Sequence, residues 1–482
     1  MINYKVIARV LSILLIIEGA MMLFTALISG IYQDHITSSF LWSALITLIA
    51  GAMAFTPLKE EDKIAGSREG HIIVASIWIV FALFGTLPFL ISGSIKNFTD
   101  AFFESMSGFT TTGATILTDI DSIPKGLLFW RSLTQWVGAM GVIILSLYVV
   151  PVLKDINIQL STTEFSGQHT DKIYPRAADT VKRLVALFVI LTLAEILLLN
   201  AAGMTFFDSV CQSFSTLSTG GFSTHNNSLS VYSSPYIKII LTIFMFLAGT
   251  NMSFIYFGAK RYFGKIFYNS EFLVYMSICI IFSVIISASL YFSGIFNPLN
   301  AAINGTFQVV SVITTTGFYT SDYSLWGNFV VLLIFLLMFT GGTTGSASSG
   351  IKMTRIMIMT RNNRMELRRL VHPNAYIPVR LNKKIVPQGI VYNVLVFIML
   401  YFLITCASAV IISLMGYDII TSFGTAVAML GNIGPGMGSL GPFSNYSMVP
   451  VAGKWFFSGL MLLGRLEIMT IMILFARSFY RK

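Results

Sequence analysis

The sequence predicts an all-α polytopic membrane protein in which four tandem span–pore-loop–span repeats surround one pseudo-fourfold pore, preceded by two leading transmembrane helices. Three observations predict this class. Hydrophobic residues make up 55% of the 482-residue chain and charged residues only 11%. Apolar runs near the length of about 20 residues that a helix needs to cross a bilayer recur from end to end. Between them, a short Gly-containing turn recurs four times.

Basic residues gather in alternate connections between the apolar runs. The net charge is +10, and 25 of the 31 Lys and Arg residues lie in these connections. By the positive-inside rule this pattern predicts that the connections are cytoplasmic. We therefore expect a multi-pass protein with both termini in the cytoplasm. We attribute the basic excess to this topology and not to binding of nucleic acid.

The first two predicted spans cover residues 8 to 30 and 39 to 56, and a charged linker from Lys59 to Gly70 follows. The first apolar run could be mistaken for a signal peptide. Its length, the acidic Glu18 within it and its lack of a small-residue cleavage pattern favour a retained span. Residues 1–70 are assigned to this leading pair and its cytoplasmic linker.

A pattern of span, short helix, Gly-containing turn and span then occurs four times. The short helix is clearest at Asp100 to Phe109, which is amphipathic and too short to cross a bilayer. Irregular backbone at membrane depth survives only where protein or a water-filled path satisfies its polar groups, so such a loop indicates a lined pore. The predicted repeats are 71–180, 181–271, 272–387 with a Gly-rich loop and a basic linker, and 388–482, which ends in a span from about Trp455 to Phe479.

The turns of the four repeats align on one glycine. They read T-T-T-G-A-T from Thr110, S-T-G-G-F-S-T from Ser218, I-T-T-T-G-F-Y-T from Ile313 and G-N-I-G-P-G from Gly431. Gly113, Gly221, Gly317 and Gly434 come into register at spacings of 108, 96 and 117 residues. Four copies form an internal repeat, which builds one pore from a single chain. The fourth turn departs from the Thr-Thr-Gly pattern.

The residue types in these turns suit a dehydrated cation, which needs a cage of oxygens. Glycine permits the positive φ angle that lets consecutive carbonyls point inward. Each short helix also directs its partially negative C-terminal end toward the pore centre. The predicted carbonyl ligands are those of Thr111, Thr112, Gly113, Thr219, Gly220, Gly221, Thr315, Thr316, Gly317, Asn432, Ile433 and Gly434.

Acidic side chains flank the predicted pore mouth. They either draw cations in or serve as solvated loop charges and helix caps, and both interpretations stay open. The residues are Asp100, Glu104, Asp119, Asp121, Asp208 and Asp322.

Together these residues resemble the Trk/Ktr/HKT superfamily of potassium transporters, and within it the Trk-type membrane subunits. The resemblance covers essentially the whole chain, including the leading pair that Ktr-type subunits lack and the closing G-R-L-E at 464–467. In that superfamily the four turn glycines form a potassium filter, and a Ser in the first turn of some plant members goes with sodium transport. Because all four positions are Gly here, the resemblance implies K+ as the transported ion, with Rb+ as its surrogate.

A Gly-rich loop, Thr340 to Gly350, interrupts an apolar run from Phe329 to Thr360. Small residues weaken a helix, so this stretch predicts a flexible break, and beneath a filter such a break is a gate. A kinked helix that packs tightly through small residues is the alternative. The resemblance favours the gate, whose predicted residues are Gly341, Gly342, Thr343, Thr344, Gly345, Ser346, Ala347, Ser348, Ser349 and Gly350.

Two cations complete the predicted gate. An unpaired Arg within a span costs roughly 2.5 to 3.5 kcal/mol, so Arg465 is expected to face a cavity or a partner. Glu467 is two positions away on the helix and is therefore not its obvious mate. The resemblance implies that Arg465 is an electrostatic barrier below the filter. Lys352, just past the Gly-rich loop, is a weaker candidate.

The most basic stretch, Arg361 to Pro387, either binds anionic lipid head groups or docks an acidic cytosolic subunit. The resemblance favours docking of a nucleotide-binding, RCK-type ring subunit that is TrkA-like. It also implies a homodimer in the bacterial inner (plasma) membrane.

The predicted function is channel-like potassium uptake under control of that cytosolic subunit. The alternative is a secondary transporter that couples potassium or sodium to a proton or sodium gradient. Transporters usually carry inverted repeats and charged midplane sites, whereas these four repeats share one orientation. No nucleophile or His/carboxylate constellation indicates an enzyme, and no covalently bound cofactor is expected.

Overall fold

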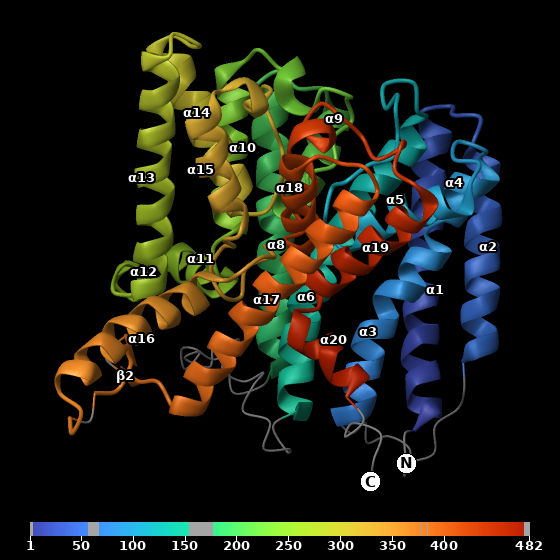
Figure 1. Cartoon of the computed structure of the whole chain (residues 1–482). Helices are drawn as coiled ribbons and strands as arrows, with labels where there is room; N and C mark the ends of the chain where they lie inside the picture. The colour runs from blue at the N-terminus through green and yellow to red at the C-terminus, as the bar shows by residue number, and fades with distance from the viewer. Residues whose placement is uncertain (1–2, 56–66, 154–176, 376, 383, 477–482) are drawn as a thin grey trace.

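The computed structural model describes residues 3–55, 67–153, 177–375, 377–382 and 384–476, so the predicted linker lies outside it up to residue 66. Figure 1 shows a helical molecule whose long helices run roughly side by side. Within the described residues, six helices are long and apolar enough to cross a membrane, or up to eight if each bent pair counts as one span. The predicted fold class is confirmed: the protein is a multi-pass helical membrane protein.

The leading pair consists of α1 (Tyr4–Ile31) and α2 (Thr37–Ala54), which pack against each other through small residues. A Cβ added to Gly19 would lie 2.7 Å from the Leu48 side chain, and one added to Gly51 would lie 3.0 Å from Ile16. Glycine therefore permits the close approach of the two helices, as is common in membranes. The pair packs on repeat 1 through α3 (Ser67–Phe84) and α6 (Lys125–Leu153).

Each repeat contains the predicted short helix between its spans. Repeat 1 has α3, α4 (Leu87–Ile91), the short helix α5 (Phe98–Phe109) and α6. Repeat 2 has α8 (Ala177–Ala201), the short helix α9 (Phe206–Leu217), α10 (Pro235–Ala248), α11 (Met252–Ala259) and α12 (Phe263–Phe267).

Repeat 3 has α13 (Ser270–Phe292), the short helix α14 (Pro298–Ile313), α15 (Asn328–Met338) and α16 (Met353–Val371), followed by β1 (Arg380–Leu381) and β2 (Lys384–Ile385). Repeat 4 has α17 (Gln388–Leu414), the short helix α18 (Ile419–Leu430), α19 (Val451–Arg465) and α20 (Ile468–Phe475). Short 3-10 helices lie at Ser228–Val231, Tyr323–Leu325 and Gly438–Leu440.

The closing spans of repeats 2 to 4 are broken. The chain bends by 110° between α10 and α11 and by 112° between α19 and α20, and α15 ends at the Gly-rich loop. The span predicted from about Trp455 to Phe479 is therefore not one straight helix, because its described part is divided into α19 and α20. The break falls at Glu467, whose φ of 60° is incompatible with a right-handed helix.

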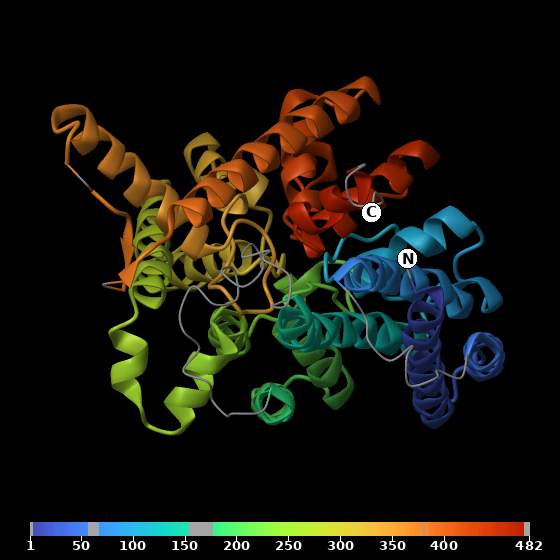
Figure 2. The ribbon, with the colours of Figure 1, turned by 90° about the horizontal axis from the view of Figure 1, so that it is seen from below.

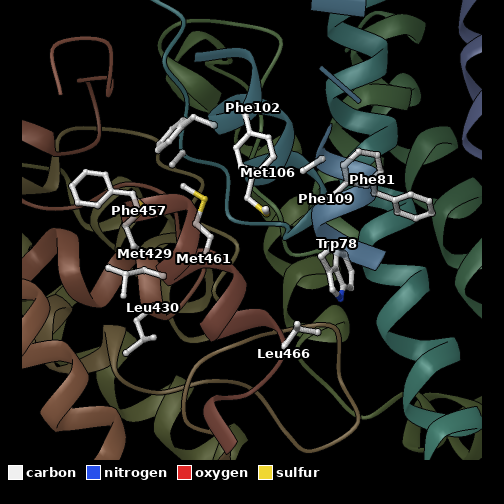
Figure 3. Close-up of a cluster of buried hydrophobic side chains, with 14 of the residues drawn as sticks. Trp78, Phe81, Phe102, Met106, Phe109, Met429, Leu430, Phe457, Met461 and Leu466 are labelled. Carbon is white, nitrogen blue, oxygen red and sulfur yellow. The ribbon is translucent and has the colours of Figure 1, made fainter. Parts of the chain in front are cut away.

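Apolar packing joins repeat 4 to repeat 1, the two repeats that lie farthest apart in the sequence. Phe102 of α5 stacks on Trp455 of α19 at 4.7 Å between ring centres, and Figure 3 shows Met106 of α5 beside Met461 of α19 in the same buried cluster as Phe109. Phe109 and Met461 are fully buried, so this seam is part of the hydrophobic core. Seen from below, the four repeats follow one another round a common centre in chain order, with α1 and α2 outside repeat 1 (Figure 2).

The start of α1 and the end of α20 lie on the same side of the molecule, which is also the side from which α16 and the β1–β2 hairpin project (Figure 1). The short helices α5, α9, α14 and α18 and the turns that follow them lie toward the opposite side. The basic α16 thus lies on the other side of the molecule from the short helices that lead into the Gly turns.

Candidate functional site

The four Gly turns share one backbone conformation. The residue two places before the glycine has φ of 52° at Thr111, 54° at Thr219, 57° at Thr315 and 53° at Asn432. The aligned glycines have φ between 77° and 94°. In every turn the N–H of the residue before the glycine donates a 2.9 Å hydrogen bond to the carbonyl five residues earlier. The fourth turn therefore adopts the same shape as the others, although its sequence differs.

The turns form a closed ring in chain order. A Cβ added to Gly113 would lie 2.2 Å from the Gly220 carbonyl oxygen, and one added to Gly221 would lie 2.0 Å from that of Thr316. The corresponding distances are 1.7 Å from Gly317 to the Ile433 oxygen and 2.5 Å from Gly434 to the Thr112 oxygen. Each glycine is thus in contact with the carbonyl of the next repeat, and no other residue fits.

Most of the predicted carbonyl ligands have no hydrogen-bond donor. In the described part of the chain, only two of them accept a hydrogen bond from the protein. The Gly220 oxygen accepts one from Gln135 Nε2 at 2.7 Å, and the Gly434 oxygen accepts one from Tyr446 Oη at 2.9 Å. Buried backbone carbonyls are usually paired, so unpaired carbonyls in a ring are suited to bind a cation.

A cavity of about 280 Å³ lies against the ring. All four turn glycines line it, together with Arg131, His225 and residues of the loops that follow the turns. The cavity therefore gives access to the ring from the side opposite to α16.

The acidic residues of the predicted mouth all have local partners. Two of them form ion pairs: Asp100 with Lys454 at 2.6 Å and Glu104 with Arg131 at 2.8 Å. The others have hydrogen-bond partners: Asp208 accepts from the Thr205 and Thr224 hydroxyls, Asp322 accepts from the Ser324 N–H, Asp119 accepts from the Asn226 amide, and Asp121 contacts the His225 ring. The carboxylates of Asp208 and Asp121 flank the imidazole and raise the pKa of His225 to about 9. These contacts favour structural roles, in particular for the buried Glu104.

The Gly-rich loop lies directly beside the ring. The Ser349 N–H donates a 2.9 Å hydrogen bond to Thr315 Oγ1, which belongs to the third Gly turn. The Thr343 N–H donates to the Gly249 carbonyl at 2.9 Å, in the break between α10 and α11. Thr340 and Ile351 form a bridge that closes the loop at its base. The predicted gate residues are thus packed under the ring.

Arg465 extends from the end of α19 into this loop. Its Nη1 donates to the Ala347 carbonyl at 3.0 Å and to Ser349 Oγ at 3.4 Å, and its Nη2 donates to the Gly138 carbonyl at 3.3 Å. Lys352 Nζ donates to the Ser348 carbonyl from the same side. The structure brings both predicted gate cations onto the Gly-rich loop.

Glu467 pairs with Arg355 of α16 at 2.6 Å and not with Arg465, as the helical spacing predicted. The Arg355 guanidinium also lies 3.6 Å from the centre of the Phe397 ring. A smaller cavity of about 60 Å³, lined by Lys352, Arg465 and Glu467 among others, lies on this side of the loop.

Further residues hold the Gly-rich loop and were not predicted from the sequence. The Thr344 N–H donates to Glu271 Oε1 at 2.6 Å, and Asn251 Nδ2 donates to the Thr344 carbonyl at 2.6 Å. Next to Glu271, both the N–H and the Oγ of Ser270 donate to Asn382 in the hairpin turn. An acidic residue at the start of an otherwise apolar span was the available signal.

Comparison with known proteins gives a consistent result. The family model TrkH, described as cation transport protein, matches residues 36–480. The Trk system potassium uptake protein TrkH of Escherichia coli K12 is 37% identical over 485 residues and covers all of both chains, and that of Halomonas elongata is 36% identical over 484 residues with the same coverage. The crystal structure of the potassium transporter TrkH from Vibrio parahaemolyticus superposes with a TM-score of 0.90 at 33% identity, covering 99% of this chain and all of that one.

Proposed function

Because this chain belongs to the TrkH family of cation transport proteins, we propose that it takes up K+ through the ring of four Gly turns, with Rb+ as a surrogate. The single observation that carries the proposal is the ring itself. Four turns of one conformation meet glycine to carbonyl, and most of the carbonyls are without a donor. Rings of backbone carbonyls replace the hydration shell of K+.

The Gly-rich loop is the proposed gate. It packs against Thr315 on one side and accepts hydrogen bonds from Arg465 on the other. A cation beneath the ring repels a permeating ion because their charges have the same sign. Opening then requires that the loop and Arg465 move away from the ring together.

Control by a cytosolic RCK-type, TrkA-like subunit is supported by a chain of contacts. The basic α16 carries exposed Leu367 and Leu370 beside its arginines, which suits a docking surface. From the hairpin that follows α16, Asn382 contacts Ser270, and the neighbouring Glu271 contacts Thr344 of the Gly-rich loop. A partner that displaces the hairpin would therefore loosen the loop. A homodimer in the bacterial inner membrane, with α16 and both chain ends cytoplasmic, completes the proposal.

Flux into liposomes tests this function. The pure protein is reconstituted and K+, Rb+, Na+ and Li+ fluxes are compared under an imposed potential, with and without residues 343–349. We expect K+ and Rb+ to pass in preference to Na+ and Li+, and the deletion to raise their flux. Equal passage of Na+, or a flux that stalls without a proton or sodium gradient, would replace the proposal with a sodium or coupled-transporter function.

A further inference from the structure

A buried ion pair lies next to the first two Gly turns and has no role in the proposed conduction or gating. Glu104 on α5 and Arg131 on α6 are joined at 2.8 Å between Oε1 and Nε, and their side chains are 0% and 2% exposed. Burying two charges is costly unless further hydrogen bonds satisfy them. The contacts of this pair therefore indicate what it holds in place.

The pair binds the segments that follow the turns of two different repeats. The Glu104 carboxylate accepts from Thr115 Oγ1 and from the Ile116 N–H, both at 3.0 Å. Arg131 Nη1 donates to the Ser223 carbonyl at 3.1 Å, and its guanidinium lies 4.1 Å from the centre of the Phe222 ring. The ion pair thus connects the chain after Gly113 to the chain after Gly221.

Gln135, one helical turn beyond Arg131, holds the same segment closer to its glycine. Its Nε2 donates to the Gly220 carbonyl at 2.7 Å, and its Oε1 accepts from the Phe222 N–H at 3.2 Å. The two contacts lie on either side of Gly221. The position of the Gly220 carbonyl, a predicted ion ligand, is therefore fixed from behind by a side chain of the neighbouring repeat.

The arrangement is particular to repeat 1. The residue nine places before the turn glycine is Glu104 there, but Gln212, Gln308 and Thr425 in the other repeats. The Glu104–Arg131 ion pair, called the brace below, therefore supports the ring from one side only, at the junction of repeats 1 and 2.

We propose that Glu104, Arg131 and Gln135 are positioning residues that set the spacing of the carbonyls between repeats 1 and 2, and thereby the preference of the ring for K+ over smaller cations. This inference rests on the proposed function. A ring held at one spacing cannot contract around Na+ or Li+, so it leaves them poorly coordinated. The planar guanidinium is needed because it directs donors to Glu104, Thr115 and Ser223 at once, which an ammonium group does not do.

The test compares selectivity in Arg131→Lys and Gln135→Leu with that of the wild type. The readout is the ratio of Rb+ to Na+ flux in liposomes, which does not depend on how many copies are correctly inserted. Arg131→Lys keeps a positive charge beside Glu104 and so supports folding, but it loses the planar guanidinium with its several donors. We expect each variant to lower the ratio about tenfold, as the loss of a buried hydrogen bond permits.

The matched control is the ion pair one turn earlier on α5. Asp100 is four residues before Glu104 and pairs with Lys454, which also donates to the Ser447 carbonyl; neither side chain contacts a turn glycine or the three residues that follow it. The Asp100→Asn/Lys454→Gln double variant should keep the wild-type ratio within about twofold, because it loses a comparable pair without touching the ring.

Two results overturn the brace: wild-type selectivity in both Arg131→Lys and Gln135→Leu, or an equal loss in the control double variant, which would mean general loosening. A wild-type protein that passes Na+ as readily as Rb+ overturns the proposed function instead, so the two failures are distinguishable.

Discussion

Gly317 is the most confined residue of the ring. Its φ is 78°, and an added Cβ would lie 1.7 Å from the Ile433 carbonyl oxygen. Gly317→Ala should therefore abolish Rb+ flux, because the new methyl group displaces a proposed ligand in addition to the roughly 1–3 kcal/mol of backbone strain. Gly294 is the matched control: its φ is 69°, and no atom lies within 4 Å of an added Cβ. If Rb+ flux in liposomes survives in Gly317→Ala as well as in Gly294→Ala, the tight contact between Gly317 and the Ile433 carbonyl is not needed for transport.

Arg465 donates to the Ala347 carbonyl and to Ser349 Oγ in the Gly-rich loop, and to the Gly138 carbonyl in α6. Arg465→Gln removes the charge below the ring and weakens the contacts with Ala347 and Gly138. We expect the basal Rb+ flux of the protein without any cytosolic partner to rise about tenfold or more, since hydrogen bonds of charged groups contribute roughly 1.5–3 kcal/mol. Lys96→Gln, at an exposed position, serves as the control for a lost cation. An unchanged basal flux in Arg465→Gln would argue against the barrier.

His225 lines the cavity that lies against the ring, and its protonation makes the stability of the protein depend on pH. Asp208 and Asp121 raise its pKa to about 9 from an ordinary value near 6.5. The protonated imidazole therefore contributes stability that is complete below about pH 6.5 and is lost as pH rises through about 9. Because the side chain is 28% exposed, we expect no more than about 1 kcal/mol. Thermal unfolding in detergent should show a fall in stability between pH 7 and 9.5 that His225→Gln lacks; equal falls would contradict the assignment.

At the scale of elements, the β1–β2 hairpin is joined to the Gly-rich loop through the first turn of α13. Asn382 adopts a φ of 49° and accepts both hydrogen bonds from Ser270. Asn382→Gly keeps that conformation available but removes the acceptor. We expect basal Rb+ flux to change about two- to tenfold, in line with one or two net hydrogen bonds.

Asn374→Gly, in the same connection and exposed, is the control for this change. If the two variants behave alike in the liposome assay, the hairpin does not act on the loop through α13.

The short helices and their turns were predictable because their signals are local. A helix of about ten residues that ends in a Gly turn needs only its own sequence, and the four copies support one another. The common turn shape also explains why Gly431 to Gly434 conforms without a Thr-Thr-Gly sequence: the hydrogen bond from the Ile433 N–H to the Ala428 carbonyl is made by backbone alone.

The bends in the closing spans were harder to predict because tertiary contacts produce them. Gly464 lies within α19 and no Pro or Gly stands at the bend itself, while apolar residues flank Arg465 and Glu467 on both sides. Its backbone departs from the helix where its carboxylate pairs with Arg355 of α16. The contact between Glu271 and Thr344 likewise joins two repeat-3 segments 73 residues apart, which no local pattern reveals.

At the scale of the whole molecule, topology and charge agree. The basic α16, the start of α1 and the end of α20 lie on one side of the molecule, as the alternation of Lys and Arg along the chain predicts (Figure 1). Four repeats in one orientation place four equivalent turns at one level, and the ring then closes by the packing of repeat 4 on repeat 1. The sequence predicted the number of turns and their register, whereas the braces behind them depend on side chains from neighbouring repeats.

In the proposed function, K+ crosses through the ring without a coupled ion. The most direct measurement is the reversal potential of current through the reconstituted protein lacking residues 343–349, under a K+ gradient with pH and Na+ varied independently. Uncoupled K+ transport should give a reversal potential at the K+ equilibrium potential, and proton or sodium gradients should not shift it. A reversal potential that shifts with either gradient would contradict it.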